Sequence, residues 1–452
     1  MSSLAPMHAS SAARDANDFL AALGGNMQAT GGAPTAQRVG LAPRTEFRFE
    51  TEPETSVTIT LASGTAEVFG AELVPRRPYT FADAQLAVFT WHGCTLDVVG
   101  SCGHSYVAEE TPMASYLQLH NELEERRALA AAHGTSGPRV LVTGPKETGK
   151  SSLCRLLANY LVRNHRSALM VDLDVAQGDI AVPGCVAAAS VERPLDPQGS
   201  TEDLTPMAYW LGHVSANEHA GQFRRAVGAL SEGVEGRLSA DAAARAGGLV
   251  INTAGWVDGP GYDSLLQQID QFRADVLVVI GDDRLHSQLS AYVAQSTAPR
   301  VVRKLSKSGG VISRSAAART AAANARVREY FYGVPGDLCP HSTIHDFDAL
   351  QVSTIGAPPQ GPITALPIGA KLSQDQLAAT RVAAGQWPSL THAVLAVVFS
   401  ESAKCDDLLG ASVAGFVYVS SVDMEKQQVT LLAPSPLPMP TATLLAGSIK
   451  WL

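Results

Sequence analysis

The strongest constraint on the fold is the run Gly144-Pro-Lys-Glu-Thr-Gly-Lys-Ser151, which matches the pattern GxxxxGK[ST] at every required position. It follows an apolar run at 139–142 and opens a helical pattern at 150–164. The glycines let backbone N–H groups turn inward around phosphates, and the helix N-terminus adds a positive dipole. Lys150 can neutralise the β- and γ-phosphates, and the Ser151 hydroxyl can ligate Mg²⁺. The sequence therefore predicts a nucleoside triphosphate site.

The middle third of the chain alternates strand and helix patterns. Apolar runs at 139–142, 168–173, 249–251 and 276–280 are separated by helical patterns at 150–164 and 264–273. Continuous apolar strands between helices are typical of a mostly parallel sheet covered on both faces. We therefore expect a central α/β P-loop NTPase domain at 136–335.

The flanking segments are rich in short strands. Period-two alternation from Phe47 to Val99, interrupted by turn residues, predicts an N-terminal all-β domain that, with the following helix at 113–133, covers 44–135. Strand patterns return at 363–366, 392–400, 413–419 and 428–432, which predicts a C-terminal β-rich domain at 336–452. Residues 1–43 are rich in Ala, Ser, Gly and Thr without a sustained period, and we interpret them as a mobile tail.

Composition limits the class of protein. Of 452 residues, 46% are hydrophobic, which excludes wholesale disorder, and the net charge of -9 argues against a protein that coats nucleic acid. The six cysteines form no CxxC pair, so a reducing compartment is expected. The longest strongly apolar run, near 393–399, is far shorter than the ~18 residues of a membrane helix, and no secretory signal is recognisable. The expectation is a soluble intracellular protein that binds no membrane.

A basic segment stands out against the acidic average. Eight cations fall between Arg300 and Arg328, and no acid falls between Asp283 and Glu329. These eight are Arg300, Arg303, Lys304, Lys307, Arg314, Arg319, Arg326 and Arg328. The segment suits a lid that closes arginines on a triphosphate, or a track for a polynucleotide backbone. The alternative is a basic surface that contacts an acidic partner or domain.

Two carboxylates follow the apolar run at 168–173. Asp172 and Asp174 are two residues apart, so both side chains can point the same way on a strand. In P-loop proteins an acid at this position holds the Mg²⁺ shell or accepts a proton from the nucleophile. We favour Asp174, the more C-terminal residue, and the alternative is that either acid caps a loop.

The run Asn252-Thr-Ala-Gly-Trp256 follows the apolar run at 249–251. It should therefore lie at the C-terminal edge of the sheet, where ligands bind in open α/β folds. Trp256 could stack on a base and Thr253 could contact phosphate or metal. The alternative is a buried tryptophan beside a glycine turn.

Cysteine and histidine pairs raise the question of a metal site. His92-Gly-Cys94 and Cys102-Gly-His104 are mirror images across a predicted hairpin and could gather four zinc ligands. The His-x-Cys spacing is uncommon among zinc ligands, so coincidental strand residues are the favoured interpretation. Cys339, His341 and His345 are interpreted as a domain-boundary loop.

The nucleotide is predicted to be ATP. The strand end that should carry a GTPase Asp-x-x-Gly switch reads Asn252-Thr-Ala-Gly255 instead, and no Asn-Lys-x-Asp base-recognition motif occurs. Neither a repeat nor a second helicase-like lobe is apparent, which argues against a motor. A kinase-type enzyme and an ATP-locked binding protein remain.

Several motifs together resemble one family. The central ones are Pro138-Arg-Val-Leu-Val-Thr-Gly-Pro-Lys-Glu-Thr-Gly-Lys-Ser-Ser, Asp172-Leu-Asp-Val-Ala-Gln-Gly and Ile251-Asn-Thr-Ala-Gly-Trp-Val. Others are Thr45-Glu-Phe-Arg-Phe-Glu, Val88-Phe-Thr-Trp-His-Gly-Cys, Ser306-Lys-Ser-Gly-Gly-Val and Arg328-Glu-Tyr-Phe-Tyr-Gly. Over about 44–452 the chain resembles the polynucleotide 5′-hydroxyl-kinase-like ATP-binding subunit of the pre-mRNA 3′-end cleavage and polyadenylation machinery.

The resemblance implies a three-part architecture, a nuclear location and a role for each motif. The phosphates would be wrapped by Glu147, Thr148, Gly149, Lys150, Ser151 and Ser152. Asp174 would be the catalytic or Mg²⁺-linked carboxylate, and Arg314 and Arg319 the lid arginines. Thr253, Gly255 and Trp256 would clasp the RNA end, and Glu46 would sit at the adenine. A scaffold subunit would dock on the central domain.

Two departures from the family pattern bear on activity. Ala176 stands where the family tends to carry Gly before Gln177, and Gln85 is the nearest polar residue where a Lys is usual near the adenine. Some members are active RNA kinases, whereas others hold ATP without turnover. Two functions are therefore expected: an ATP-occupied subunit required for endonucleolytic cleavage and mRNA 3′-end formation, or an ATP-dependent kinase acting on an RNA 5′-hydroxyl.

Overall fold

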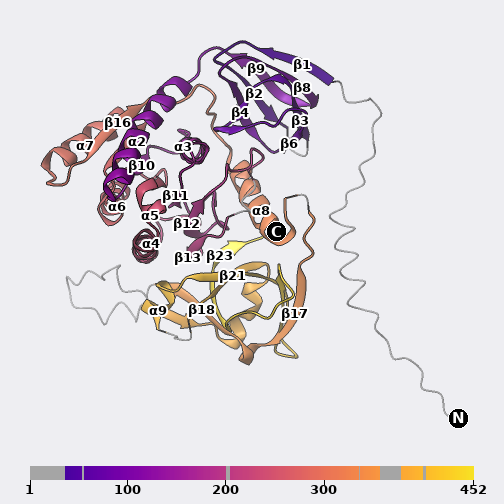
Figure 1. Ribbon diagram of the computed structural model, residues 1–452. Helices are drawn as coiled ribbons and strands as arrows, with labels where there is room; N and C mark the ends of the chain where they lie inside the picture. The colour runs from indigo at the N-terminus through magenta and orange to yellow at the C-terminus, as the bar shows by residue number, and fades with distance from the viewer. Residues whose placement is uncertain are drawn as a thin grey trace.

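The computed structural model describes residues 36–52, 55–199, 204–334, 336–356, 378–400 and 404–451. A β-sandwich, a central α/β domain and a C-terminal β-rich domain follow one another along the chain (Figure 1). This architecture confirms the predicted fold class. Across the described residues, no helix is both long enough and apolar enough to span a membrane.

The N-terminal domain packs two sheets face to face. One sheet has the order β1-β8-β3-β6 and the other β5-β4-β7-β2-β9. The strands are β1 (Ala36–Leu41), β2 (Thr45–Thr51), β3 (Ser56–Gly64), β4 (Glu67–Val68), β5 (Ala71–Glu72), β6 (Pro78–Ala82), β7 (Gln85–Thr90), β8 (Cys94–Gly100) and β9 (Cys102–Ala108). Val57, Ile59 and Leu61 alternate along β3 into the buried interior, as their period-two spacing predicts.

The tail prediction was wrong at its C-terminal end. Residues 36–41, assigned to the tail, form β1, which pairs antiparallel with β8. Val39 and Leu41 are buried in the sandwich core, and this burial holds the short strand in place. Residues 1–35 lie outside the described residues.

The central domain is built on a seven-stranded sheet with the order β13-β12-β11-β14-β10-β15-β16. Its strands are β10 (Arg139–Thr143), β11 (Ala168–Asp172), β12 (Cys185–Val191), β13 (Met207–Trp210), β14 (Leu249–Asn252), β15 (Val276–Ile280) and β16 (Val301–Leu305). Five of these strands are parallel, whereas β12 and β13 add an antiparallel edge. The predicted mostly parallel sheet is therefore confirmed, with a mixed edge.

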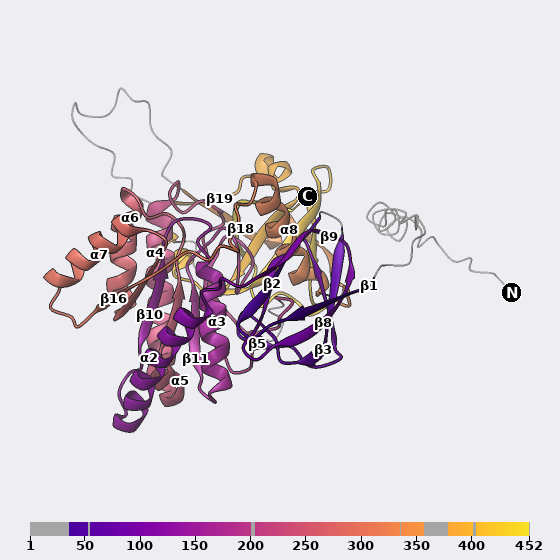
Figure 2. The same ribbon diagram turned by 90° about the horizontal axis from the view of Figure 1, so that it is seen from above.

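Helices cover both faces of this sheet (Figures 1 and 2). They are α2 (Met113–His133), α3 (Lys150–Arg163), α4 (Ala220–Ala240), α5 (Ala242–Gly247), α6 (Pro260–Gln271), α7 (Asp283–Gln295) and α8 (Ala316–Tyr332). Val140 and Val142 of β10 share one core with α2 and α3, whereas Leu141 shares the other core with α4, α6 and α7. Neighbouring residues of a strand point to opposite faces, so an unbroken apolar run serves both cores.

The C-terminal domain contains a second seven-stranded sheet, of order β17-β22-β21-β20-β23-β18-β19. Its elements are β17 (His341–Asp346), η1 (Phe347–Ala349), β18 (Gln351–Gly356), β19 (Ala378–Arg381), η3 (Ala384–Leu390), β20 (Ala393–Val398), α9 (Cys405–Leu409), β21 (Val413–Asp423), β22 (Gln428–Ala433) and β23 (Thr443–Lys450). The strand predicted at 363–366 lies outside the described residues. Trp210 of the central domain packs against Phe416 with ring centroids 5.4 Å apart, so the two domains share a core.

The N-terminal domain docks on α3, the helix that begins at the P-loop. Asn159 Nδ2 donates to the Phe69 carbonyl at 2.8 Å, and Arg163 Nη1 donates to Glu67 Oε2 at 2.7 Å. Tyr160 OH also donates to Glu67. The two domains therefore meet along the helix that presents the phosphate-binding loop.

Candidate nucleotide and acceptor site

The loop between β10 and α3 has the backbone that a phosphate cradle requires. Gly144 and Gly149 adopt φ values of 148° and 90°. A Cβ at Gly144 would lie 2.6 Å from the Ile280 carbonyl oxygen, and one at Gly149 would lie 3.2 Å from Val311 Cγ2. Only glycine satisfies both the positive φ and the close approach. Gly149 is the N-cap of α3, so the loop delivers the positive end of that helix.

Lys150 lies beneath this loop rather than in solvent. Its side chain is buried, with 6% of the residue exposed, and Nζ donates to the Pro145 carbonyl at 2.7 Å. Burial lowers the pKa of Lys150, and the nearby Asp174 carboxylate opposes that shift. The Thr148 hydroxyl donates to the same Pro145 carbonyl at 3.0 Å. Lysine and threonine therefore hold the loop in a closed curve.

Ser151 is connected to a carboxylate through one amide. Asn252 Nδ2, at the end of β14, donates to Ser151 Oγ at 3.1 Å and to Asp172 Oδ1 at 3.0 Å. Asn252 is fully buried, and its Oδ1 has no hydrogen-bond partner among the described residues. Asn252 carries no predicted role of its own; the signal in the sequence is a polar residue that ends a buried strand.

The two acids after β11 are both buried but are held differently. Asp172 accepts backbone N–H groups from Asp174 and Asp179, each at 3.0 Å. Burial and the neighbouring Asp179 and Asp174 carboxylates raise the pKa of Asp172 well above its usual range. The carboxylate joined to Ser151 through Asn252 is thus Asp172, whereas the sequence favoured Asp174.

Asp174 lies in the loop beyond β11. It accepts from Ala176 N at 3.1 Å and from Gln177 Nε2 at 2.9 Å. Burial raises the pKa of Asp174, while the Gln177 and Ala176 donors and Lys150 partly oppose the rise. Residue 176 contacts Asp174 through its backbone N–H, so Ala176 makes the same hydrogen bond that a glycine at this position would make.

The segment after β14 packs against the P-loop. Thr253 is 1% exposed, and its hydroxyl donates to the Val142 carbonyl at 2.9 Å, so it ties two strands together. A Cβ at Gly255 would lie 2.5 Å from Lys146 Cγ and 2.6 Å from Lys146 N. Trp256 is half-buried, packed on the core and on Gly261. The structure brings Gly255 directly to the phosphate loop.

The predicted lid arginines also lie at the P-loop. Arg314 N and Arg319 Nη1 both donate to Glu147 Oε1 at 2.9 Å. These contacts, led by the Arg314 N–H, lower the pKa of Glu147. Glu147 has a φ of 59°, a left-handed conformation uncommon for a side-chain-bearing residue. The start of α8 is therefore latched to the phosphate loop by Glu147.

Most other cations of the basic segment are paired. Acids from other elements meet three of them: Arg300 with Asp270, Arg303 with Glu122, and Lys304 with Asp283; Arg326 pairs with Glu329, one turn along α8. The prediction of eight unopposed charges was wrong here, because folding brings acids from other elements to three of these cations and Glu329 pairs with a fourth. Arg314 and Arg319 are the two that reach the P-loop.

The two residues expected at the adenine, Glu46 and Gln85, approach the central domain differently: Glu46 through its partner Arg48, and Gln85 through a direct contact with Arg314. Glu46 is buried; Oε1 pairs with Arg48 at 2.5 Å, and Oε2 accepts from Thr111 at 2.9 Å. Arg48 lies against the glycines at 309 and 310. Gln85 instead donates to Glu50 at 2.8 Å and accepts from Arg314 Nε at 3.4 Å.

The residues considered for zinc do not form the predicted hairpin. Cys94 begins β8 and Cys102 begins β9, and these strands belong to different sheets. Where residues are described, no three His, Cys, Asp or Glu side chains gather in a way that could hold a metal ion. His341 and His345 lie in β17 rather than in a loop.

Comparison with known proteins identifies relatives over most of the chain. Residues 144–333 match the family model "mRNA cleavage and polyadenylation factor CLP1 P-loop". Residues 40–130 match "N-terminal beta-sandwich domain of polyadenylation factor", and residues 338–452 match "Pre-mRNA cleavage complex II protein Clp1".

Full-length relatives agree with these matches. A protein CLP1 homolog of Arabidopsis thaliana is 39% identical over 429 residues, 93% of this chain and 95% of that protein. The polyribonucleotide 5′-hydroxyl-kinase Clp1 of Bos taurus is 39% identical over 415 residues, covering 91% and 96%. A solved structure of a wild-type Clp1p–Pcf11p complex has a TM-score of 0.81 at 21% identity, covering 93% of this chain and 99% of that one, which supports the fold.

Proposed function

Since the chain belongs to the mRNA cleavage and polyadenylation factor CLP1 family, we propose that it is the ATP-binding subunit of this factor, required for endonucleolytic cleavage and mRNA 3′-end formation. The observation that carries the proposal is the position of the P-loop between two domains. Gln85 of the β-sandwich reaches Arg314, and Arg314 is bonded through its N–H to Glu147 of the loop. Bound nucleotide would therefore order the interface between the domains.

Each part of the site has an assigned role in holding ATP. The phosphates would lie on the N–H groups of residues 147–152, with Lys150 neutralising their charge. Arg314 and Arg319 would close from α8, and Glu46 and Gln85 would face the base from the sandwich. The loop conformation supports this assignment, because Gly144 and Gly149 have positive φ values and an added Cβ at either would crowd Ile280 or Val311.

The residues present also fit Mg²⁺. Hydroxyl and carboxylate oxygens are the ligands this ion prefers, and Ser151 and Asp174 would hold it, with Asp172 reaching Ser151 through Asn252. The orphan Asn252 Oδ1 offers one further buried oxygen at the same place. When bound, Mg²⁺ would offset the charge of the β- and γ-phosphates.

Nucleotide retention tests this function. Protein purified without added ATP is denatured, and the released nucleotide is identified by chromatography for the wild type, Lys150→Ala and the matched surface control Lys426→Ala. We expect intact ATP from the wild type and the control but little from Lys150→Ala. In extracts depleted of the endogenous factor, the wild type and the control should restore endonucleolytic cleavage of a pre-mRNA substrate. Absence of nucleotide from the wild type, or full cleavage without the protein, would refute the proposal.

A second candidate function is kinase activity on an RNA 5′-hydroxyl. The raised pKa of Asp174, which lies near Lys150, favours this activity, because a carboxylate whose pKa is closer to neutral pH is a better proton acceptor. Asp174 would take the proton of the 5′-hydroxyl as its oxygen attacks the γ-phosphorus, and ADP would leave. Lys150, Arg314 and Arg319 would neutralise charge in the transition state, with the RNA end clasped by Thr253, Gly255 and Trp256.

Transfer of labelled γ-phosphate to a 5′-hydroxyl RNA oligomer, compared with a DNA oligomer, separates the two functions. Label dependent on both Lys150 and Asp174, lost in Lys150→Ala and Asp174→Asn, would establish the kinase. Intact ATP in the wild type with no transfer would leave the binding role alone. The proposal also includes a nuclear location and a scaffold subunit contacting the central domain, which imaging of a tagged chain and co-purification would test.

A further inference from the structure

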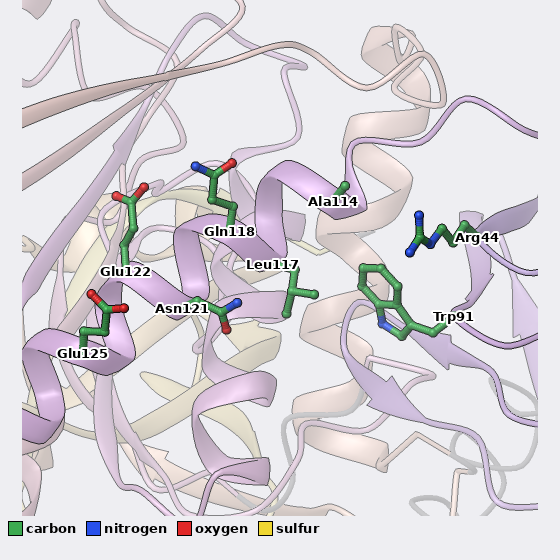
Figure 3. Close-up of a pocket in the computed structure, with 8 residues that line it drawn as sticks. All are labelled: Arg44, Trp91, Ala114, Leu117, Gln118, Asn121, Glu122 and Glu125. Carbon is green, nitrogen blue, oxygen red and sulfur yellow. The ribbon is translucent and has the colours of Figure 1, made fainter.

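A groove separates α2 from the end of the β-sandwich, away from the P-loop (Figure 3). It encloses about 440 Å³ and is lined by Arg44, Trp91, Ala114, Leu117, Gln118, Asn121, Glu122 and Glu125. The α2 residues recur every three or four positions, so they form one stripe along the helix. Trp91 follows the end of β7 opposite to Gln85, about 20 Å away along the strand. The groove is therefore distinct from the nucleotide site.

The floor of the groove is apolar and held in place. Figure 3 shows Leu117 pointing toward the Trp91 indole. Both side chains are half-exposed and pack against the main core. Trp91 is fixed by an edge contact to Phe89, with centroids 4.8 Å apart, and by a hydrogen bond from its Nε1 to Tyr160 OH at 3.4 Å. A rigid aromatic surface of this kind suits one inserted apolar side chain.

The two ends of the groove carry opposite charges. Arg44 lies beside Trp91, and Glu125 lies at the far end (Figure 3). Neither side chain forms an ion pair or hydrogen bond with any residue that the structure describes, whereas Glu122 already accepts from Arg303 at 3.0 Å. The groove thus offers an unused cation at one end and an unused carboxylate at the other.

From this arrangement we propose that the groove is a docking site for an extended segment of a partner protein. The segment places an apolar side chain between Trp91 and Leu117 and a basic side chain at Glu125. Along α2, Leu117 and Glu125 are about 12 Å apart, which an extended chain spans in three to four residues. The exposed amides of Gln118 and Asn121 lie between them and can pair with backbone N–H and C=O groups, which an extended segment leaves free.

Charge argues against the other macromolecular ligand of this protein class. Arg44 is the single cation among the residues that line the groove, and the unpaired Glu125 would repel an RNA backbone, whose affinity for proteins depends on cations at its phosphates. The proposal goes beyond ATP binding and does not depend on it.

The test is a selection of random twelve-residue peptides on the intact, nucleotide-retaining chain, followed by fluorescence polarisation of the selected peptides. Selected peptides should carry an apolar residue with Lys or Arg three or four positions away. Leu117→Asp should weaken binding at least about 30-fold, as loss of a central apolar contact does, whereas Leu129→Asp, 61% exposed on the same helix, should leave it unchanged. Glu125→Lys should weaken it about tenfold, and exchanging the basic residue of the peptide for Glu should restore affinity.

Several outcomes would overturn the proposal. They are failure to select any binder, selected peptides that bind Leu117→Asp as well as the wild type, or competition by RNA. A shift to dimer in light scattering that Leu117→Asp abolishes would instead assign the groove to a second copy of the chain. Nucleotide retention, measured on the same samples, stays independent of each result, so failure of the ATP-binding function is recognised separately.

Discussion

Adding one methyl group at Gly255 should weaken ATP binding through the P-loop. The new Cβ would lie 2.5 Å from Lys146 Cγ, 2.6 Å from Lys146 N and 2.7 Å from Lys146 Cα. Two of these three atoms belong to the phosphate-loop backbone, so a change of side-chain rotamer does not relieve the overlap. Overpacking of this kind costs about 1–3 kcal/mol. If the P-loop yields, Gly255→Ala weakens ATP binding by about 5- to 150-fold.

The assay is competition of ATP against a fluorescent analogue on nucleotide-stripped protein, with thermal unfolding of the stripped protein measured in parallel. Gly236→Ala is the matched control, because a Cβ there meets nothing within 4 Å and the residue lies in α4. It should leave the ATP affinity unchanged and stabilise the helix by up to about 1 kcal/mol. If Gly255→Ala lowers the unfolding temperature while ATP binds normally, the segment after β14 has moved instead of the P-loop. The reasoning about Lys146 is then refuted.

Three further perturbations probe separate contacts. Asn252→Ala should cost about 1–3 kcal/mol of unfolding free energy and weaken Mg²⁺-dependent ATP binding, because the buried Asp172 and the half-buried Ser151 lose their donor; unchanged urea unfolding would contradict this. Burial lowers the pKa of His120 from 6.5 to about 4, and the ring accepts from Asn164 Nδ2 at 3.0 Å, so it folds neutral. Between pH 6.5 and 4 the unfolded chain then binds more protons than the folded chain, so the free energy of unfolding should decrease by up to about 3 kcal/mol as the pH is lowered through this range. His120→Gln should reduce this decrease, and an equal pH dependence of the unfolding free energy in both proteins would disprove the reasoning. Glu147→Gln should speed tryptic cleavage at Arg319 with little change in unfolding temperature, because an exposed ion pair contributes under about 1 kcal/mol; unchanged cleavage would exclude the latch.

Local sequence patterns predicted the central domain well, because its P-loop and its buried strands are each encoded by residues that are close together in the chain. The P-loop needs glycine at positions where the backbone is left-handed or crowded, and the motif records those positions directly. The apolar runs of β10, β11, β14 and β15 are buried on both faces, so each is unambiguous by itself. The strand β12 was missed because it is rich in alanine, a residue with little strand preference, and β13 because it is only four residues long.

Long-range contacts were beyond the reach of sequence patterns. The basic segment appeared unopposed because its partners, such as Glu122 and Asp270, come from other elements. Asn252 joins Ser151 to Asp172 only because β14 lies between β10 and β11 in the sheet. Strand order is a property of the assembled sheet, and no spacing along the chain encodes it.

The two candidate functions differ in whether Arg319 stays bonded to Glu147 or turns to the γ-phosphate of ATP. Arg319 is bonded to Glu147, which stands in the P-loop itself, so this guanidinium cannot fully engage a γ-phosphate while that bond lasts. The pair is half-exposed and therefore weak, and a triphosphate with its higher charge can compete for the arginine. Meanwhile α3, which starts at the P-loop, is fixed to the β-sandwich at Asn159 and Arg163. Loop and helix thus stay in place whichever partner Arg319 takes. ATP could therefore be held without transfer, and in the kinase function Arg319 would reach the γ-phosphate once the start of α8 exchanges Glu147 for phosphate.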